Sequence, residues 1–103
     1  MEKVINETVE MAHEHFKKFG FEDAQIVQLL ESGKRDLTKE LNKLQKILDQ
    51  EPIEIDKVNL SIHALKGLFL TMGNAKAGEK LTELHNKSGD TRILAEIKFL
   101  LDL

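Results

Sequence analysis

The sequence predicts an all-α protein built as an antiparallel bundle of helices. Over most of the chain, apolar residues recur at alternating steps of four and three, which places them along one face of a helix. The period-two alternation typical of strands occurs only briefly, in residues 51–56, which hold the one proline and three acidic residues. Short helices are marginally stable alone, so their apolar faces must pack together, and short connections make neighbouring helices antiparallel.

The first two helices are marked by their apolar faces and by nearby glycines. The first face ends before Gly20, a residue type that favours the left-handed conformation after a helix. Its members are Ile5, Val9, Ala12, Phe16 and Phe19. The second face has one gap, which contains Gly33, and its members are Ile26, Leu30, Leu37, Leu41, Leu44 and Leu48. The gap allows a bend or two short helices, and we expect one helix from about Glu22 to Gln50.

Pro52 separates the second helix from the third, because proline lacks an amide hydrogen and fixes its own φ angle. We expect the third helix from about Glu54 to Met72 and Asn74 as the N-cap of a fourth. The fourth helix carries Ala77, Leu81 and Leu84. Residues 86–90 are typical of a loop, whose last residue is suited to cap a final helix. The apolar residues of that helix are Ile93, Ile97, Leu100 and Leu101.

Length and composition limit the class of protein. The 103 residues fit one domain, residues 1–103, with enough chain for a buried core. The absence of cysteine excludes disulfides and thiolate metal sites and suits a cytoplasmic location. The N-terminus lacks the apolar run of a secretory signal, and no stretch approaches the roughly 20 apolar residues of a membrane span. The initiating Met1 and the length favour a free-standing protein.

The charge pattern argues against nucleic acid as the main partner. The formal net charge is −3 and the acidic and basic residues are interspersed, whereas phosphate binding favours a basic face. Five Phe residues without Trp or Tyr argue against an aromatic platform for bases.

His63 lies in the middle of the third expected helix. With about 100° of rotation per residue, the core side of this helix is made of Val58, Ile62, Leu65, Leu68, Phe69 and Met72. The residues within about 60° of His63 are Asn59, Lys66, Gly67, Leu70 and Asn74. We therefore expect the imidazole on the outer face, where a lone histidine is most often an ordinary surface residue.

The neighbours of His63 suit a phosphoryl acceptor. A neutral imidazole is a good nucleophile toward an activated phosphoryl group. Lys66, one turn along, offsets the charge of that group, and Gly67 leaves room for a partner's active site. Leu70 offers the partner an apolar contact.

The run His63-Ala64-Leu65-Lys66-Gly67, followed by Gly73, resembles the His-x-Leu-Lys-Gly…Gly signature of histidine phosphotransfer (HPt) domains. The helices expected before and after this run are similar to those of the family, so the resemblance covers essentially the whole chain. It implies an antiparallel four-helix bundle with an additional N-terminal helix. It also implies that Leu65 is a core residue and that Gly73 serves the turn after the histidine helix.

The resemblance further implies a phosphorelay carrier of a two-component system. His63 would be the phosphoacceptor, with Lys66 and Gly67 in supporting roles. Its partners would be response-regulator receiver domains or a hybrid sensor histidine kinase. The carrier would be a monomer, not an enzyme with its own turnover, and would bind no cofactor, since the Mg²⁺ belongs to the receiver. Asn59, Leu70 and Asn74 are expected to contact the partner.

The sequence departs from the family pattern after Gly67. Small or hydroxylated residues are frequent at the next three positions, where this chain has Leu68, Phe69 and Leu70. The first two point toward the core by the angular count, whereas Leu70 shares the face of His63. Asn74 replaces the alanine that often follows the last glycine of the motif.

Two other functions stay open. A degenerate HPt-like adaptor would bind receivers or kinases without accepting phosphate. A dimerisation hairpin of a sensor kinase usually has an acidic residue after its histidine, whereas Ala64 stands here, and the chain has no ATP-binding domain.

The remaining histidines do not indicate a metal site. His13 and His15 point in different directions on a helix, and Glu10 with His13 forms only one of the two Glu-x-x-His units that a di-metal bundle needs. His85 suits the C-terminal end of the fourth helix and is given no function.

Overall fold

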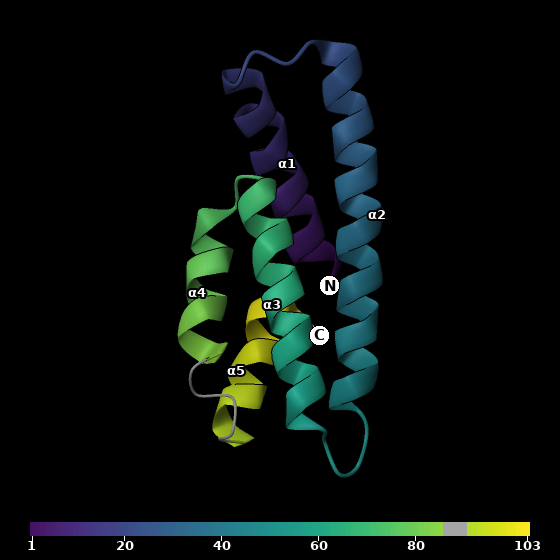
Figure 1. Cartoon of the computed structure of the whole chain (residues 1–103), viewed down its shortest axis with the longest axis vertical. Coiled ribbons are helices and arrows are strands. Elements are labelled where there is room, and N and C mark those ends of the chain that lie inside the picture. The colour runs from purple at the N-terminus through teal and green to yellow at the C-terminus, as the bar shows by residue number, and fades with distance from the viewer. Residues whose placement is uncertain (86–90) are drawn as a thin grey trace.

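The computed structural model describes residues 1–85 and 91–103. This part of the chain is all-helical and contains no strand, which confirms the prediction of an all-α protein. Its helices are α1 (Glu2–Lys18), α2 (Asp23–Leu48), α3 (Ile55–Thr71), α4 (Ala75–His85) and α5 (Thr91–Leu101) (Figure 1). The loop expected at residues 86–90 and its capping residue Asp90 lie outside the described residues.

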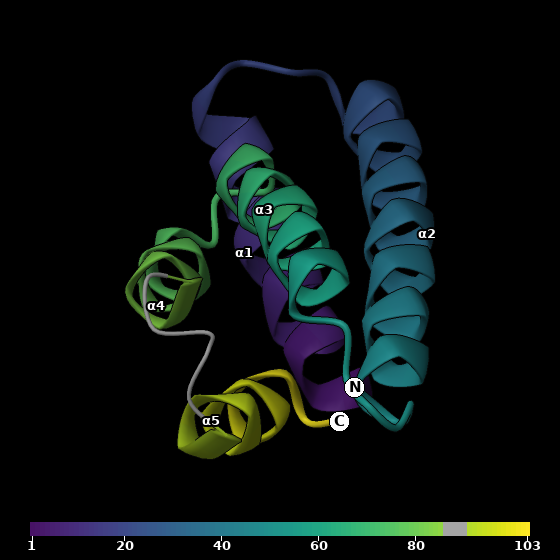
Figure 2. The same cartoon turned by 60° about the horizontal axis from the view of Figure 1, so that its bottom comes forward.

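The helices pack as a bundle in which each one runs opposite to its neighbour in the chain (Figure 1). Contacts join α1 to α2, α2 to α3, α3 to α4 and α4 to α5. In Figure 2, α2 and α4 lie on opposite sides of α3. Helix α3 is therefore held from two sides, and its outward face lies next to α4.

The core is made by one side of each helix. Its fully buried large side chains are Ile26, Leu37, Leu41, Leu44, Val58, Ile62, Leu65, Phe69, Met72, Leu81, Ile97 and Leu101. The predicted core residue Leu30 is only partly buried, and Leu68 on α3 likewise. The other predicted core residues of α3 are buried, among them Leu65.

The core face of α1 differs from the prediction at its end. Helix α1 stops at Lys18, and Gly20 has a φ of +85°, as expected for the residue after a helix cap. Phe19 lies beyond the last helical turn and is 67% exposed, so the prediction that it belongs to the core face is wrong. Thr8 is buried on this face instead.

Helix α2 is continuous through Gly33, as expected. A β-carbon at Gly33 would lie 2.8 Å from Cε and 2.9 Å from Sδ of Met72. The missing side chain therefore makes room for the buried Met72 at the end of α3. The gap in the apolar pattern of α2 is thus explained by contact with Met72, and the helix continues through it.

The turn from α3 to α4 is fixed by Gly73 and Asn74. Gly73 has a φ of +82°, a conformation that side chains other than glycine rarely adopt. Asn74 Oδ1 accepts a hydrogen bond from the Ala77 backbone amide at 3.1 Å, which confirms Asn74 as the N-cap of α4. Asn74 Nδ2 also donates to Thr8 Oγ1 at 2.9 Å and so joins the turn to α1.

The two ends of the chain meet on one side of the bundle. The Met1 amine lies 2.8 Å from the Asp102 carboxylate. This amine holds the pKa of the Asp102 carboxyl below its ordinary value. Within the described residues, every helix is too short or too polar to cross a membrane.

Candidate functional site

His63 lies on the exposed side of α3, as predicted. The residues next to it in the chain show why: Ile62 is buried and Leu65 is fully buried, and both anchor the opposite side of the helix in the core. The imidazole is exposed. Because the apolar side of α3 is buried in the core, its opposite side, which carries His63, faces the solvent.

The surface next to His63 is open where Gly67 stands. Gly67 is exposed, and a β-carbon built on it would meet no atom within 4 Å. Glycine is unfavourable in the interior of a helix, and no close neighbour in the structure requires it here. The physical consequence of Gly67 is therefore that the His63 ring is accessible from this side.

Lys66 lies on the same face and is half-buried. Its position three residues after His63 places the two side chains on neighbouring turns. The long apolar stem of a lysine can lie along the helix surface while its ammonium group stays in water. Lys66 is thus suited to bring a positive charge near a group bound to His63.

Two exposed leucines lie on either side of His63 along α3. Leu70 is 45% exposed, as expected from the angular count. Leu60 is 71% exposed and was not among the residues expected on this face. Its position three residues before His63, about 60° away on the helix, was a sufficient signal. An exposed leucine alone means little, but these two place an apolar side chain on the helix before and after His63.

Leu70 leans on α4 and does not cover the histidine. A β-carbon at Gly78 would lie 2.8 Å from Leu70 Cδ2 and 3.7 Å from the carbonyl oxygen of Lys66. Gly78 therefore makes room for Leu70 on the α4 side. Leu70 lies seven residues, or about 10 Å, along the helix from His63.

The other two residues expected to contact a partner are placed differently. Asn59 is half-buried on the His63 face and has an interaction partner. Asn74 is only 4% exposed, and both ends of its amide are used in hydrogen bonds to Ala77 and Thr8. Its side chain is a structural element of the turn and offers almost no surface to a partner.

The residues that depart from the family pattern are mostly internal. Phe69 is fully buried and Leu68 is half-buried, so their bulk lies away from the imidazole. Of the three, Leu70 alone adds an exposed apolar side chain to the face of His63.

The histidines of α1 have other surroundings. His13 is exposed and lies 3.9 Å from the Glu14 carboxylate. His15 packs edge-on against Phe19, with ring centroids 4.8 Å apart, and it covers Gly73. No group of three or more potential metal ligands occurs in the part of the chain that the structure describes.

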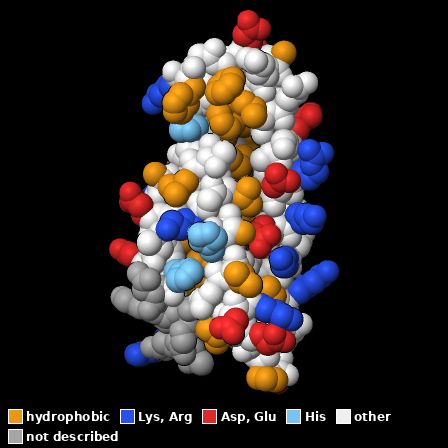
Figure 3. All heavy atoms as spheres, in the orientation of Figure 1, with side chains coloured by type: hydrophobic (Ala, Val, Ile, Leu, Met, Phe, Trp, Pro, Cys, Tyr) orange, Lys and Arg blue, Asp and Glu red, His pale blue; other side chains and the backbone are white. Residues whose placement is uncertain are grey.

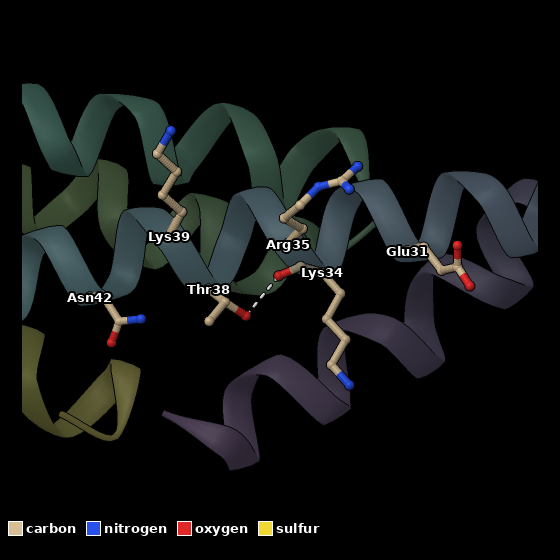
Figure 4. A pocket seen from close by; sticks show the side chains of 6 residues that line it. All are labelled: Glu31, Lys34, Arg35, Thr38, Lys39 and Asn42. Atoms are coloured by element: carbon tan, nitrogen blue, oxygen red, sulfur yellow. Dashed lines mark hydrogen bonds between the residues drawn. The ribbon is translucent and has the colours of Figure 1, made fainter.

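A shallow hollow lies on the outer side of α2, remote in the chain from His63. It has a volume of about 560 Å³ and is lined by Glu31, Lys34, Arg35, Thr38, Lys39 and Asn42 (Figure 4). Thr38 Oγ1 donates to the Lys34 carbonyl at 2.7 Å. All six residues come from one helix, and their charged ends point away from one another in Figure 4, so the hollow offers no convergent set of ligands.

Comparison of the chain with protein family models, with curated proteins and with solved structures finds no match. The local chemistry of the His63 face is therefore the basis for assigning a function.

Proposed function

We propose that this chain is a histidine phosphotransfer domain that carries a phosphoryl group on His63. One observation carries the proposal: an exposed imidazole stands next to the open space left by Gly67, on a helix held by the core. A buried or crowded ring would be useless to a second protein's active site. The proposal includes the finer architecture, in which α2 to α5 form the family's four-helix bundle and α1 is the additional helix.

In the proposed reaction, a ring nitrogen of neutral His63 attacks the phosphorus of an aspartyl phosphate on a receiver domain. The N–P bond forms as the P–O bond to the aspartate breaks, and the aspartate leaves as a carboxylate. The reverse step passes the phosphoryl group from His63 to the aspartate of another receiver. The receiver and its Mg²⁺ supply the charge stabilisation, and this chain supplies a positioned nucleophile.

Lys66 and Gly67 support this reaction in different ways. The Lys66 ammonium is suited to offset the negative charge of the phosphoryl group on the next turn. Gly67 keeps the approach to the ring clear, because no other helix and no side chain beyond its two chain neighbours lies within 4 Å of the place where a side chain would begin. Both residues contribute through position, since His63 alone forms a bond.

The docking surface in this proposal consists of Leu60 and Leu70, with His63 between them. The partner is a receiver domain, whose acidic pocket would close over His63. Burial of an exposed leucine on binding is favourable by about 1.5–3 kcal/mol, less the cost of ordering the interface. Leu60 and Leu70 thus supply binding energy at a distance from the reacting atoms.

The proposal is tested by transfer from a phosphorylated receiver domain. The receiver is labelled, freed of its phosphodonor and mixed with the 11.7 kDa chain. We expect label on the chain that is stable in alkali and lost in acid, as for phosphohistidine, and no label on His63→Gln. The matched control is His13→Gln, which changes another exposed histidine and should accept label normally.

Each other outcome has a defined meaning. Label that persists on His63→Gln places the acceptor elsewhere and contradicts the proposal. Binding of receivers by the folded wild-type chain without any label identifies the alternative, a degenerate HPt-like adaptor.

A further inference from the structure

The contact between Leu70 and Gly78 fixes the register of α3 against α4. The two helices run in opposite directions (Figure 1), so a step back along α3 and a step forward along α4 lead the same way. Seven residues before Leu70 is His63, and seven residues after Gly78 is His85. Seven residues are about 10 Å along a helix and return within about 20° of the same face. His63 and His85 therefore stand at the same level of the α3–α4 seam.

The burial of α4 agrees with this register. Leu81 and Leu84 are buried in the core, whereas Thr82 and His85 are half-buried, as expected for residues at the edge of a helix contact. In Figure 3, two histidine side chains are visible over the α3–α4 part of the surface. By this register, His85 lies on α4 at the level of His63 on α3.

In the last turn of α4, residues 82–85, His85 is the side chain that carries an N–H donor. Thr82 Oγ1 already donates to the carbonyl of Gly78 at 2.9 Å. Glu83 is an acceptor and lies 3.5 Å from Lys80. A neutral imidazole carries one N–H donor and a protonated one carries two.

We propose that His85 is a positioning residue for the phosphoryl group on His63 and donates a hydrogen bond to one of its oxygens. This inference rests on the proposed function and names a second residue of the same site. Phosphoryl transfer passes through a loose transition state in which the bond to the leaving group is largely broken. A donor aimed at the oxygens of the bound phosphoryl group stabilises the phosphohistidine before that bond breaks and slows its hydrolysis.

The test uses phosphoramidate, a small phosphodonor that acts without a receiver domain. An imidazole nitrogen of His63 attacks its phosphorus, the N–P bond to the amine breaks, and ammonia leaves with the proton that it needs. The rate of phosphoryl loss by hydrolysis is then followed for the wild type, His85→Ala and His85→Gln. The control is His13→Ala, which removes an exposed histidine of α1.

We expect His85→Ala to lose the phosphoryl group about fivefold faster than the wild type, the effect of one net hydrogen bond. His85→Gln keeps an N–H donor and should restore a lifetime near that of the wild type, whereas a purely steric role would not separate Gln from other substitutions. His13→Ala should match the wild type. Equal lifetimes for the wild type and His85→Ala would overturn the proposal, as would a Gln variant as short-lived as Ala.

A second measurement on the unphosphorylated chain tests the geometry alone. The substitution His63→Ala should shift the NMR signals of the His85 ring, because the two residues stand at the same level of neighbouring helices, and should leave those of the His13 ring in place. An unshifted His85 ring would overturn the register. Failure of receivers to transfer label, with these His85 effects intact, would contradict the proposed function and leave the pairing of the two histidines standing.

Discussion

Leu70 on α3 lies against Gly78 on α4 so closely that a β-carbon at Gly78 would stand 2.8 Å from Leu70 Cδ2. This contact has two consequences for the site. It draws the bulk of Leu70 toward α4, so the open surface over Gly67 stays clear, and it brings His85 to the level of His63.

Replacement of Leu60 by serine should weaken transfer from a receiver without loss of stability. Leu60 is 71% exposed, so the free energy of unfolding should change by less than about 0.5 kcal/mol. Loss of an apolar docking contact should raise the receiver concentration for half-maximal transfer by about tenfold. The measurement is the initial rate of label transfer against receiver concentration, with Val27→Ser near the start of α2 as the control. Equal effects of the two substitutions would remove Leu60 from the docking surface.

Two substitutions of Gly67 should have different effects, one on the stability of the fold and one on the access of a partner to His63. Gly67→Ala should raise the free energy of unfolding by about 0.5–1 kcal/mol, because alanine is the better helix former and its β-carbon meets no neighbour. Gly67→Phe should fold but lose most of its transfer activity, because its ring occupies the space beside His63. Urea unfolding and label transfer measure the two effects, with Ala24→Phe on α2 as the control. Undiminished transfer by Gly67→Phe would show that the partner does not approach over this position.

The same exchange at Gly33 should have the opposite sign. A β-carbon there would stand 2.8 Å from Cε of Met72, so the end of this side chain would have to shift although it is only 2% exposed. Overpacking typically lowers the free energy of unfolding by about 1–3 kcal/mol, which exceeds the gain from the higher helix propensity of alanine. Gly33→Ala should therefore unfold at lower urea concentration than the wild type, and Gly67→Ala at higher. A Gly33→Ala protein as stable as Gly67→Ala would contradict the close approach of α2 and α3.

Asn74 should prove structural. Asn74→Ala removes the N-cap of α4 and the hydrogen bond to Thr8, and should lower the free energy of unfolding by about 1–3 kcal/mol. Asn74→Ser keeps a capping oxygen and should cost less. Both variants, when folded, should accept label from receivers at the wild-type rate, because the side chain is only 4% exposed. Slow transfer by a fully folded Asn74→Ser would return this residue to the docking surface.

Much of the fold could be predicted from the spacing of apolar residues and from a few turn residues. Gly20 and Asn74 each mark a helix end as expected, and the predicted third helix, Glu54 to Met72, differs from α3 by one residue at each end. Phe19 was misplaced because it is the C-cap at the end of α1, where its side chain is 67% exposed. Thr8 is buried through its hydrogen bond to Asn74, which no apolar pattern reveals.

Of the site, the sequence predicted the exposed position of His63 and the accessibility beside Gly67, since both follow from one helix. It did not predict where Leu70 would lean or that His85 stands level with His63. Those relations depend on the register between α3 and α4, which the small residue Gly78 sets by admitting Leu70. A periodic pattern orients each helix toward the core but does not fix how far two helices slide past one another.

The most direct test of the central claim is to locate the phosphoryl group after transfer from a receiver. The labelled chain is digested at alkaline pH, which preserves phosphohistidine, and the modified residue is identified by tandem mass spectrometry. We predict one phosphoryl group, on His63, and its return to a fresh unphosphorylated receiver when one is added. A phosphoryl group on His13, His15, His85 or a carboxylate, with His63 unmodified, would contradict the account.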